Sequence, residues 1–442
     1  MAIVTHQKQV PYSWMIALSL PWAVSAYTET ISGAPLTFTM DKFIKHPLGI
    51  TALSGINTLF NFLVGVFAAY FSDRIWTRFG RRKPFLIASW LGAGLSMLLL
   101  PTAPNLVTLI FAVVLYQFCI DLGRPWEPLF NEIVPPHQRG RATMFRMMAV
   151  FGLAFVFWSF VFGEFRNPRA FGVLPFSGEV LIYGSGTVVV FLAVVFITFF
   201  VKETPPPEGL PAKEPFNLIN MFKDMFAERQ AWFVYLLYLA PVVAGVAGGA
   251  MADLYRRNQL GLTEQFMGRS YAFGIPFQIF LMTPLCGFLA DKLPRMWLFR
   301  AGLLGPALVN FGFFYLYVRF VTDYNLTFWP YTLWGMFGAL WGTMLAVTWG
   351  PLIFDYIPER RMGTYMGGIA TVTGLLGFAL QNVSGIWVSG VTHFFGTRGK
   401  SEYDYSSVFI LGLLLACLAV GMTLFFRFAE RRGWVVKQTQ TA

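Results

Sequence analysis

The sequence has little charge. Asp, Glu, Lys and Arg make up 12% of its 442 residues, whereas a soluble domain carries about 25%. The hydrophobic share is 56% and the mean hydropathy is +0.57. Apolar side chains in this excess need lipid as their solvent, which excludes a cytosolic enzyme, a disordered tail and a nucleic-acid-binding module. The apolar runs are long and do not alternate, which excludes an outer-membrane barrel. The predicted fold class is an all-α polytopic membrane protein.

Cysteine and histidine are also scarce. The three cysteines, Cys119, Cys286 and Cys417, lie in apolar segments without CxxC spacing, so we expect neither a disulfide framework nor a metal cluster. The four histidines fall in predicted loops, which argues against a buried imidazole relay. The apolar segments hold no Ser-His or metal-ligand constellation. We therefore expect no enzymatic activity, no cofactor and no metal.

Long hydrophobic runs, in contrast, are abundant. A membrane span needs about 20 mainly apolar residues. Twelve segments qualify, at 12–36, 49–72, 84–102, 105–126, 142–163, 180–201, 231–252, 268–290, 297–320, 328–350, 363–390 and 405–427. The predicted organisation is a six-helix bundle over 1–201, a cytoplasmic linker over 202–230 and a second six-helix bundle over 231–442.

The linker has two parts. Its opening, KETPPPEGLPAKEP, is rich in proline and predicts an extended chain. The following FNLINMFKDMFAERQ places Phe216, Ile219, Phe222 and Phe226 near one helical face, which predicts an amphipathic helix at the membrane interface. The alternative is a loop helix without membrane contact.

Two motifs recur at nearly the same offset. WEPLFNEIVPPHQRG, from Trp126, returns as WGPLIFDYIPERRMG from Trp349, 223 positions later. FSDRIWTRFGRR, around Asp73, is matched by GFLADKLPRM around Asp291, 218 positions later. A duplicated set of six helices is the internal symmetry typical of a secondary transporter.

Basic residues predict the orientation. The net charge is +11. If both termini are cytoplasmic, the inner segments carry roughly twice as many Lys and Arg as the outer ones, as the positive-inside rule requires. We therefore expect a multi-pass protein of the cell membrane with both termini inside and no nucleic-acid partner.

The twelve spans, the linker and the loop SDRIWTRFGRRKPF (72–85) together resemble the major facilitator superfamily over essentially the whole chain. Residues Ile75 to Phe79 separate the Asp-Arg pair from Gly-Arg-Arg, a form similar to the glycoside–pentoside–hexuronide cation symporters and the proton-coupled sucrose transporters. Ala69 departs from the Gly of the general signature, which the second copy keeps as Gly287. The resemblance implies two pseudo-symmetric bundles that give alternating access to a central site.

Charged residues at the ends of the repeated helices predict a cytoplasmic gate. Acids at helix ends and nearby arginines could form ion pairs in one conformation and lose them in another. The alternative is that these charges only fix the topology. The predicted gate residues are Asp73, Arg74, Arg78, Arg81, Arg82, Glu132, Arg139, Asp291, Asp355 and Arg360.

Ionisable residues inside spans are costly in lipid and are candidates for coupling. The candidates are Glu29, Asp121, Arg124, Glu127 and Arg146. The strongest predicted pair is Asp121 with Arg146, in which the carboxyl loads a proton and releases it when the arginine moves or substrate binds. The resembled sugar symporters place substrate and cation contacts at these two places. The alternative is a static ion pair that fixes helix packing.

The second span departs from the sodium-coupled relatives. Melibiose-type symporters carry two carboxylates there, one turn apart, and those places fall on Asn61 and Gly65. A sodium cage would lose its charge, so the sequence favours proton coupling or facilitated exchange.

Polar and aromatic residues in the spans form the predicted substrate set, because sugars bind aromatic faces and hydrogen-bonding side chains. They are Trp22, Tyr27, Asn57, Asn61, Gln117, Trp126, Gln278, Trp341, Gln381 and Asn382. We expect a monomeric symporter of protons and a small polar solute that is a sugar or a glycoside. The alternatives are an exporter of drugs or other metabolites, and a sensor or assembly factor with a transporter fold.

Overall fold

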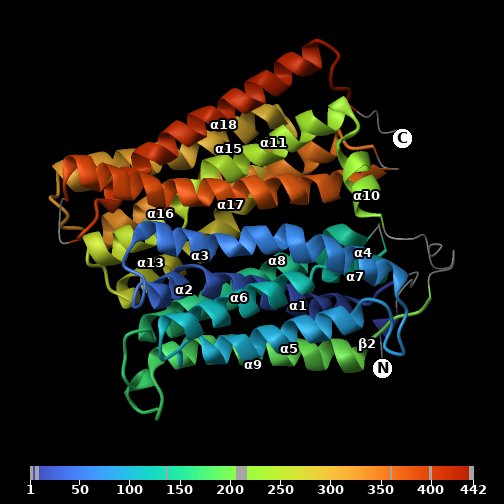
Figure 1. The fold of residues 1–442 in the computed structure, drawn as a ribbon, viewed down its shortest axis with the longest axis horizontal. Coiled ribbons are helices and arrows are strands. Elements are labelled where there is room, and N and C mark those ends of the chain that lie inside the picture. The colour runs from blue at the N-terminus through green and yellow to red at the C-terminus, as the bar shows by residue number, and fades with distance from the viewer. Residues whose placement is uncertain are drawn as a thin grey trace. The chain divides into compact units, whose positions relative to one another are not determined.

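Most of the chain is helical. The computed structural model describes residues 3–4, 9–135, 138–205, 217–358, 361–397 and 401–437, and each of the twelve predicted spans is helical there. Eight helices in the described residues are long and apolar enough to cross a membrane, and Lys83–Leu99 and Leu106–Leu122 are shorter apolar helices. The all-α polytopic fold is therefore confirmed (Figure 1).

The chain folds into two compact units. The first comprises Met1–Lys45, Phe60–Pro215 and Met267–Ala272. The second comprises His46–Leu59, Phe216–Phe266 and Phe273–Ala442. The division therefore falls inside the second and eighth predicted spans as well as near the linker.

The first unit begins with a broken helix and ends with a long unbroken one. Its elements, π-helical and 3-10 segments being labelled η, are β1 Ile3–Val4, α1 Tyr12–Ser32, α2 Ala34–Met40, η1 Asn61–Gly65, α4 Val66–Arg74, α5 Lys83–Leu99, α6 Leu106–Leu122, α7 Trp126–Ile133, α8 Arg139–Val156, η3 Phe157–Val161, η4 Phe162–Glu164, η5 Ala170–Gly172, α9 Gly178–Phe200 and β2 Val201–Lys202. The strands β1 and β2 pair in parallel, with Ile3 opposite Val201.

The second unit repeats this pattern. Its elements are α3 Pro47–Phe60, α10 Leu218–Phe226, α11 Arg229–Gly245, η6 Val246–Gly248, α12 Ala250–Leu254, η7 Tyr255–Gln259, α13 Glu264–Phe277, η8 Gln278–Met282, α14 Thr283–Lys292, α15 Arg295–Asn310, η9 Phe311–Val318, α16 Phe328–Phe354, α17 Met362–Phe395, η11 Tyr405–Ser407 and α18 Val408–Arg431. The last residue of α3, and Met267–Ala272 of α13, belong to the first unit.

The internal repeat extends to irregularities of the backbone. Gly33 interrupts the first helix of the chain with φ −80° and ψ −117°. Gly249, 216 positions later, interrupts the seventh span with φ −87° and ψ −142°. The π-helical segments η1 and η8 begin at Asn61 and Gln278, 217 positions apart. The two copies therefore share the same helix breaks as well as the same motifs.

Each unit also ties the end of its first span to the start of its last. In the first unit the Thr39 hydroxyl donates to Glu179 Oε1 at 2.6 Å, and Lys42 forms an ion pair with the same carboxylate. In the second unit the Gln259 amide donates to Asp404 Oδ1 at 3.1 Å. These buried polar ties hold the helix ends of each bundle at fixed positions.

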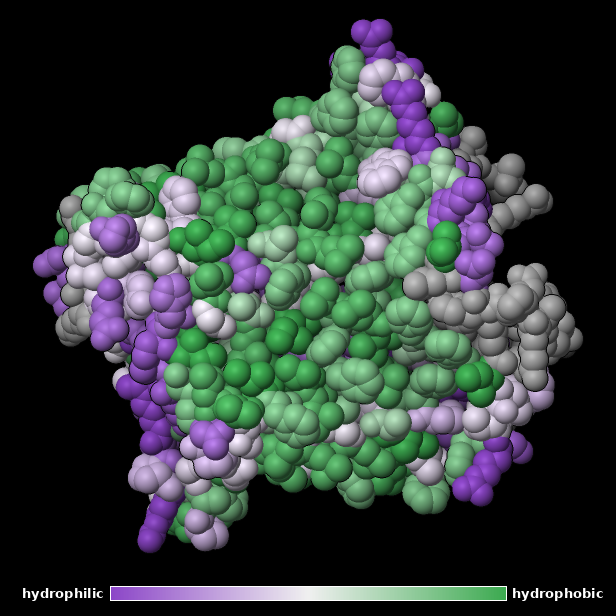
Figure 2. Space-filling view, viewed as in Figure 1, coloured by the Kyte–Doolittle hydropathy of each residue, from purple (hydrophilic) through white to green (hydrophobic). Residues whose placement is uncertain are grey.

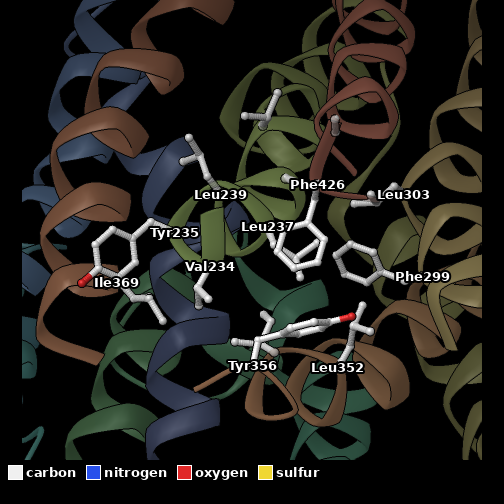
Figure 3. Close-up of a cluster of buried hydrophobic side chains, with 14 of the residues drawn as sticks. Val234, Tyr235, Leu237, Leu239, Phe299, Leu303, Leu352, Tyr356, Ile369 and Phe426 are labelled. Carbon is white, nitrogen blue, oxygen red and sulfur yellow. The ribbon is translucent and has the colours of Figure 1, made fainter. Parts of the chain in front are cut away.

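Apolar packing fills the interior of each unit. Figure 3 shows Leu237 of α11, Phe299 and Leu303 of α15 and Phe426 of α18 turned toward one another in the second unit. In the first unit Leu18, Trp90, Leu129 and Val194 belong to a similar buried cluster. On the visible face, apolar side chains cover the helix flanks and polar ones gather at the helix ends (Figure 2), as a lipid environment requires.

The helix predicted in the linker is present as α10. Its Met225 is buried, and its backbone carbonyl accepts a hydrogen bond from the Tyr235 hydroxyl at 2.6 Å. Phe226 packs against the rings of Trp232 and Tyr235. Ile219 is exposed, and Phe216 lies outside the described residues. Contact with the membrane interface stays a prediction.

Candidate functional site

An ion pair lies at the end of α6 in the first unit. The Asp121 side chain is 0% exposed, and its Oδ1 accepts from Arg124 Nη2 at 2.9 Å and from Nε at 3.1 Å. Asp121 Oδ2 is buried and has no hydrogen-bond partner. Arg124 is half exposed. Only one carboxylate oxygen of Asp121 is therefore paired with a positive charge, and the other has no hydrogen-bond donor.

A tight turn brings these two residues together. The helix α6 ends at Leu122, and the backbone N–H of Gly123 donates to the carbonyl of Ile120 at 3.0 Å. A Cβ on Gly123 would lie 2.7 Å from Ser89 Oγ of α5, so any larger residue would have to displace the Ser89 side chain. The chain then reverses far enough for Arg124 to reach back to the last turn of α6.

The π-helical segment η1 packs on the other side of Arg124. A Cβ on Gly65 would lie 3.0 Å from Arg124 Cγ and 3.6 Å from Asn61 Oδ1. The absence of a side chain at Gly65 therefore makes room for the arginine. The Arg124 side chain therefore lies beside Gly65, one of the two positions considered for sodium ligands in the sequence.

Glu29 is the second acid of this cluster. It lies on α1, one turn before the break at Gly33, and its carboxyl interacts electrostatically with Arg124 and with Asp121. The buried Tyr116 hydroxyl, on α6, donates to the Thr28 carbonyl at 2.9 Å and joins the two helices. Arg124 is therefore bound by Asp121 and also lies within electrostatic range of Glu29.

Asp121 is bound by Arg124, and its predicted pairing with Arg146 stays a prediction. Arg146, on α8, lies over the ring of Trp22, with its guanidinium carbon 3.8 Å from the ring centroid. The turn at Gly123 brings Arg124, at i+3, to Asp121. The side chain of Glu127 lies outside the described residues.

The predicted substrate residues of the first unit divide into two groups. Gln117 is buried on α6, one helical turn before Asp121, and its Oε1 has no hydrogen-bond partner. The indole N–H of Trp22 also has none. Tyr27 instead hydrogen-bonds Ser185 at 2.8 Å, and Trp126 packs against Trp90. Gln117 and Asp121 thus have unpaired acceptors on one face of α6, and Tyr27 is paired within the unit, whereas Trp126 packs against Trp90 with its indole N–H also unpaired.

The predicted residues of the second unit are more dispersed. Gln278 donates weakly to Thr343 at 3.4 Å, and Trp341 packs against Gly305. Gln381 lies against Gly55, whose Cβ would be 3.1 Å from its Oε1. Asn382 donates to the Phe378 carbonyl at 2.8 Å. Asn57 is half-buried on α3. The side-chain amide oxygens of Gln381 and Asn382 have no hydrogen-bond partner.

The described gate residues pair inside their own units. Glu132 forms ion pairs with Arg81 and, at 2.8 Å, with Arg82. In the second unit Asp355 is 3.0 Å from Lys437 and 3.6 Å from Arg295. Arg78 lies over the ring of Phe79. Asp73, Arg74, Arg139, Asp291 and Arg360 have side chains outside the described set.

Glu203 lies beside Arg81 and Arg82 and was not among the predicted gate residues. Its carboxylate accepts the backbone N–H groups of Arg81, Arg82 and Lys83 at 2.9, 3.1 and 2.7 Å, at the start of α5. Gly80 has φ +108°, and a Cβ there would lie 2.6 Å from the Glu203 carboxyl carbon. An acid just after the sixth span, facing a helix start with free N–H groups, was the available signal.

A duplicated set of membrane-spanning helices, with a buried acid, an exposed acid and an exposed arginine in one bundle, is typical of a transporter. The model of the Major Facilitator Superfamily matches residues 13–381, and the chain belongs to this family. It is a multi-pass membrane transporter and not an enzyme.

Solved structures share the fold at low sequence identity. A D-xylose-proton symporter matches with a TM-score of 0.64 and 14% identity, over 94% of this chain and 97% of that one. A bacterial homolog of the human lysosomal transporter Spinster, in an inward-facing and occupied conformation, has a TM-score of 0.68 and 16% identity, over 98% of this chain and all of that one. These likenesses establish the fold alone.

One curated protein is similar in sequence. "H(+)/hexose cotransporter 2" of Parachlorella kessleri is 37% identical over 93 residues, which is 20% of this chain and 16% of that protein. The match therefore covers a small part of either chain.

Proposed function

We propose that the chain is a symporter of protons and a sugar or glycoside. The observation that carries the proposal is the half-compensated carboxyl of Asp121, with Oδ1 bound by Arg124 and a buried Oδ2 that lacks a partner. A proton or a substrate hydroxyl at Oδ2 would complete the hydrogen bonding of this group. The same carboxyl can therefore bind either the proton or the sugar.

Arg124 supplies the coupling step. When Asp121 takes up a proton, Arg124 loses the negative charge that it was paired with. Its attraction to Glu29, which already lies within its electrostatic range, then becomes its main ionic interaction. The unpaired Oε1 of Gln117 accepts a hydroxyl of the substrate on the same face of α6. Binding of proton and sugar thereby becomes mutually dependent, as symport requires.

The chemistry around Asn61 and Gly65 favours the proton over sodium. Sodium needs a cage of oxygen ligands with negative charge, as hard cations do, and here the cation Arg124 packs against Gly65. A D-xylose-proton symporter and a hexose cotransporter are among the similar proteins, which supports a sugar as cargo. We further propose a monomer in the cell membrane with both termini cytoplasmic.

Proteoliposomes with an acid exterior test the coupling. We expect Asp121→Asn to abolish gradient-driven accumulation of sugar while exchange at equal pH persists, because the amide supports the loaded state but cannot release a proton. Asp253→Asn is the matched control, since Asp253 is bound by Arg256 at 2.7 Å with the same i,i+3 spacing. Full accumulation by Asp121→Asn would remove this residue from the mechanism.

A thermal-shift screen of the purified protein tests the cargo. Saturation at 100 times the Kd stabilises a folded protein by about 2.7 kcal/mol, so a panel of sugars and glycosides should raise the melting temperature. We expect the response to disappear in Gln117→Leu. Stabilisation by amphipathic drugs alone would contradict the sugar proposal and favour an exporter.

A further inference from the structure

The segment between η4 and α9, residues 165–177, folds into a side arm of the first unit. Figure 1 shows it extending sideways past the start of α9, at a large angle to the helix axes. Two antiparallel helices can be joined by about two to eight residues. This connection is longer than the join needs, and it folds back on itself.

Hydrogen bonds fix the shape of the side arm. The Glu164 carboxylate accepts from the Phe171 backbone N–H at 2.8 Å and from the Asn167 amide at 2.7 Å. The N–H of Ala170 donates to the Phe176 carbonyl at 2.9 Å. The arm is therefore a built structure whose tip has a defined direction.

The tip of the side arm is apolar and strained. Phe171 is 51% exposed, Val173 79% and Phe176 38%. Phe171 has φ +53°, a conformation that is rare for a bulky residue and is kept only where the surrounding structure enforces it. The backbone thus holds an aromatic ring outward although water is a poor solvent for it.

The outward charge of the side arm is positive. Arg166 and Arg169 are exposed. The flanking acids are engaged within the unit, because Glu164 binds the arm's own backbone and Glu179 binds Thr39 and Lys42. The tip therefore combines exposed apolar side chains with basic ones, the composition of an interfacial segment.

The position of α9 in the membrane determines how deep the side arm lies relative to the lipid. This helix has 23 residues, about 35 Å at 1.5 Å per residue, against a hydrocarbon core of about 30 Å. Its flank exposes Val188, Phe191 and Phe199, as expected of a lipid-facing surface. The start of α9 at Gly178 therefore lies at the membrane boundary, and the arm projects over neighbouring lipid.

We propose that the side arm anchors the first unit to the membrane interface. Phe171 and Val173 insert at the acyl boundary, and Arg166 and Arg169 bind the phosphates of anionic headgroups. The anchor is separate from the transport site.

Spin labels measure the depth of the tip. We would attach nitroxides to Val173→Cys and, as control, to Pro104→Cys in the short α5–α6 connection, in a Cys417→Ser background because the other two cysteines are buried. In phosphatidylcholine vesicles containing phosphatidylglycerol, we expect the label at 173 to collide with oxygen severalfold more, relative to a water-soluble nickel complex, than the label at 104. Equal ratios at the two positions would overturn the proposal.

Two further variants separate the role of the tip from folding. Asn tolerates the left-handed conformation, so Phe171→Asn should keep or raise the melting temperature while the label at 173 moves into water. Arg169→Gln should lower the preference for phosphatidylglycerol about fivefold, the effect of one basic residue near an anionic surface. Strong spin–spin broadening between labels at 173 would mean that a second copy covers the tip, and would replace lipid as its partner.

Discussion

The geometry around Arg124 depends on residues that lack side chains. Gly123 allows the turn that returns Arg124 to Asp121, and Gly65 leaves the space in which the arginine lies. The charged groups of the site are thus positioned by close packing against two glycines. Substitution at either glycine should disturb the ion pair without removing a charge.

We predict that Gly65→Val displaces Arg124 and lowers gradient-driven uptake. The added side chain must push away Arg124 Cγ, which lies 3.0 Å from the position of a Cβ, and overpacking of this kind lowers the free energy of unfolding by about 1–3 kcal/mol. Gly184→Val is the matched control in α9, because nothing lies within 4 Å of a Cβ there. Uptake and melting temperature would be measured in both variants. Equal behaviour of the two would contradict the packing role of Gly65.

Sequence reasoning at this scale identified the acids better than their partners. Asp121 and Glu29 were recognisable because a carboxyl inside an apolar run is costly wherever it lies. The ion pair of Asp121 with Arg124 was not, because Arg146 and Arg124 were both near in the sequence and no pattern there marks the turn at Gly123. Glu203 was missed since its ligands are backbone N–H groups, which every residue possesses.

At the scale of elements, the loop 72–85 gains a structural explanation. The loop connects the end of α9 to the start of α5 by two sets of hydrogen bonds. The Glu203 carboxylate accepts from backbone N–H groups at the start of α5. The Lys83 ammonium donates to the carbonyls of Thr198 at 3.0 Å and Val201 at 2.8 Å at the end of α9. A carboxylate at a helix start and a cation at a helix end both complement the helix dipole. The basic motif is therefore also a junction that fixes where the linker begins.

We predict that Glu203→Ala opens this junction locally. Three backbone N–H groups would lose their acceptor, and an unsatisfied buried donor costs about 1–3 kcal/mol. Hydrogen exchange at the amides of residues 81–83 should accelerate, and the melting temperature should fall. Asp224→Ala, at an exposed acid of α10, is the control and should change neither. Unchanged exchange in Glu203→Ala would mean that other acceptors hold the start of α5.

At the scale of the whole molecule, the duplication was readable in the sequence and its details were not. The offset of the two motifs predicted two related halves, because copies of a motif keep their spacing when a bundle is repeated. The breaks at Gly33 and Gly249 and the π-helical segments at Asn61 and Gln278 have the same offset, but no local pattern marks them. Glycine and amide residues occur elsewhere in the helices without such irregularities.

Buried acids in the described part of the chain differ in how completely their oxygens are hydrogen-bonded, and we propose that this difference separates structural from functional charge. Asp404 accepts from Gln259, from Ser406 Oγ at 2.5 Å and from Arg319 at 3.2 Å, so both of its oxygens are bound. Asp121 has one oxygen bound and one without a partner. A fully bound acid has no place for a further cargo, whereas a half-bound one does.

We predict opposite outcomes for the two neutralised acids. Asp404→Asn leaves the largely buried Arg319 without its countercharge, and breaking a buried pair in this way lowers stability by about 3–5 kcal/mol. The melting temperature should fall clearly, while the folded fraction, reconstituted in proteoliposomes, still moves sugar and protons in the parent ratio. Asp121→Asn should instead keep a melting temperature near that of the parent, because the half-exposed Arg124 remains solvated when its countercharge is lost, and should lose the proton dependence of uptake. Loss of coupling in Asp404→Asn, or a large loss of stability with intact coupling in Asp121→Asn, would show that hydrogen-bond satisfaction does not distinguish the two roles in this fold.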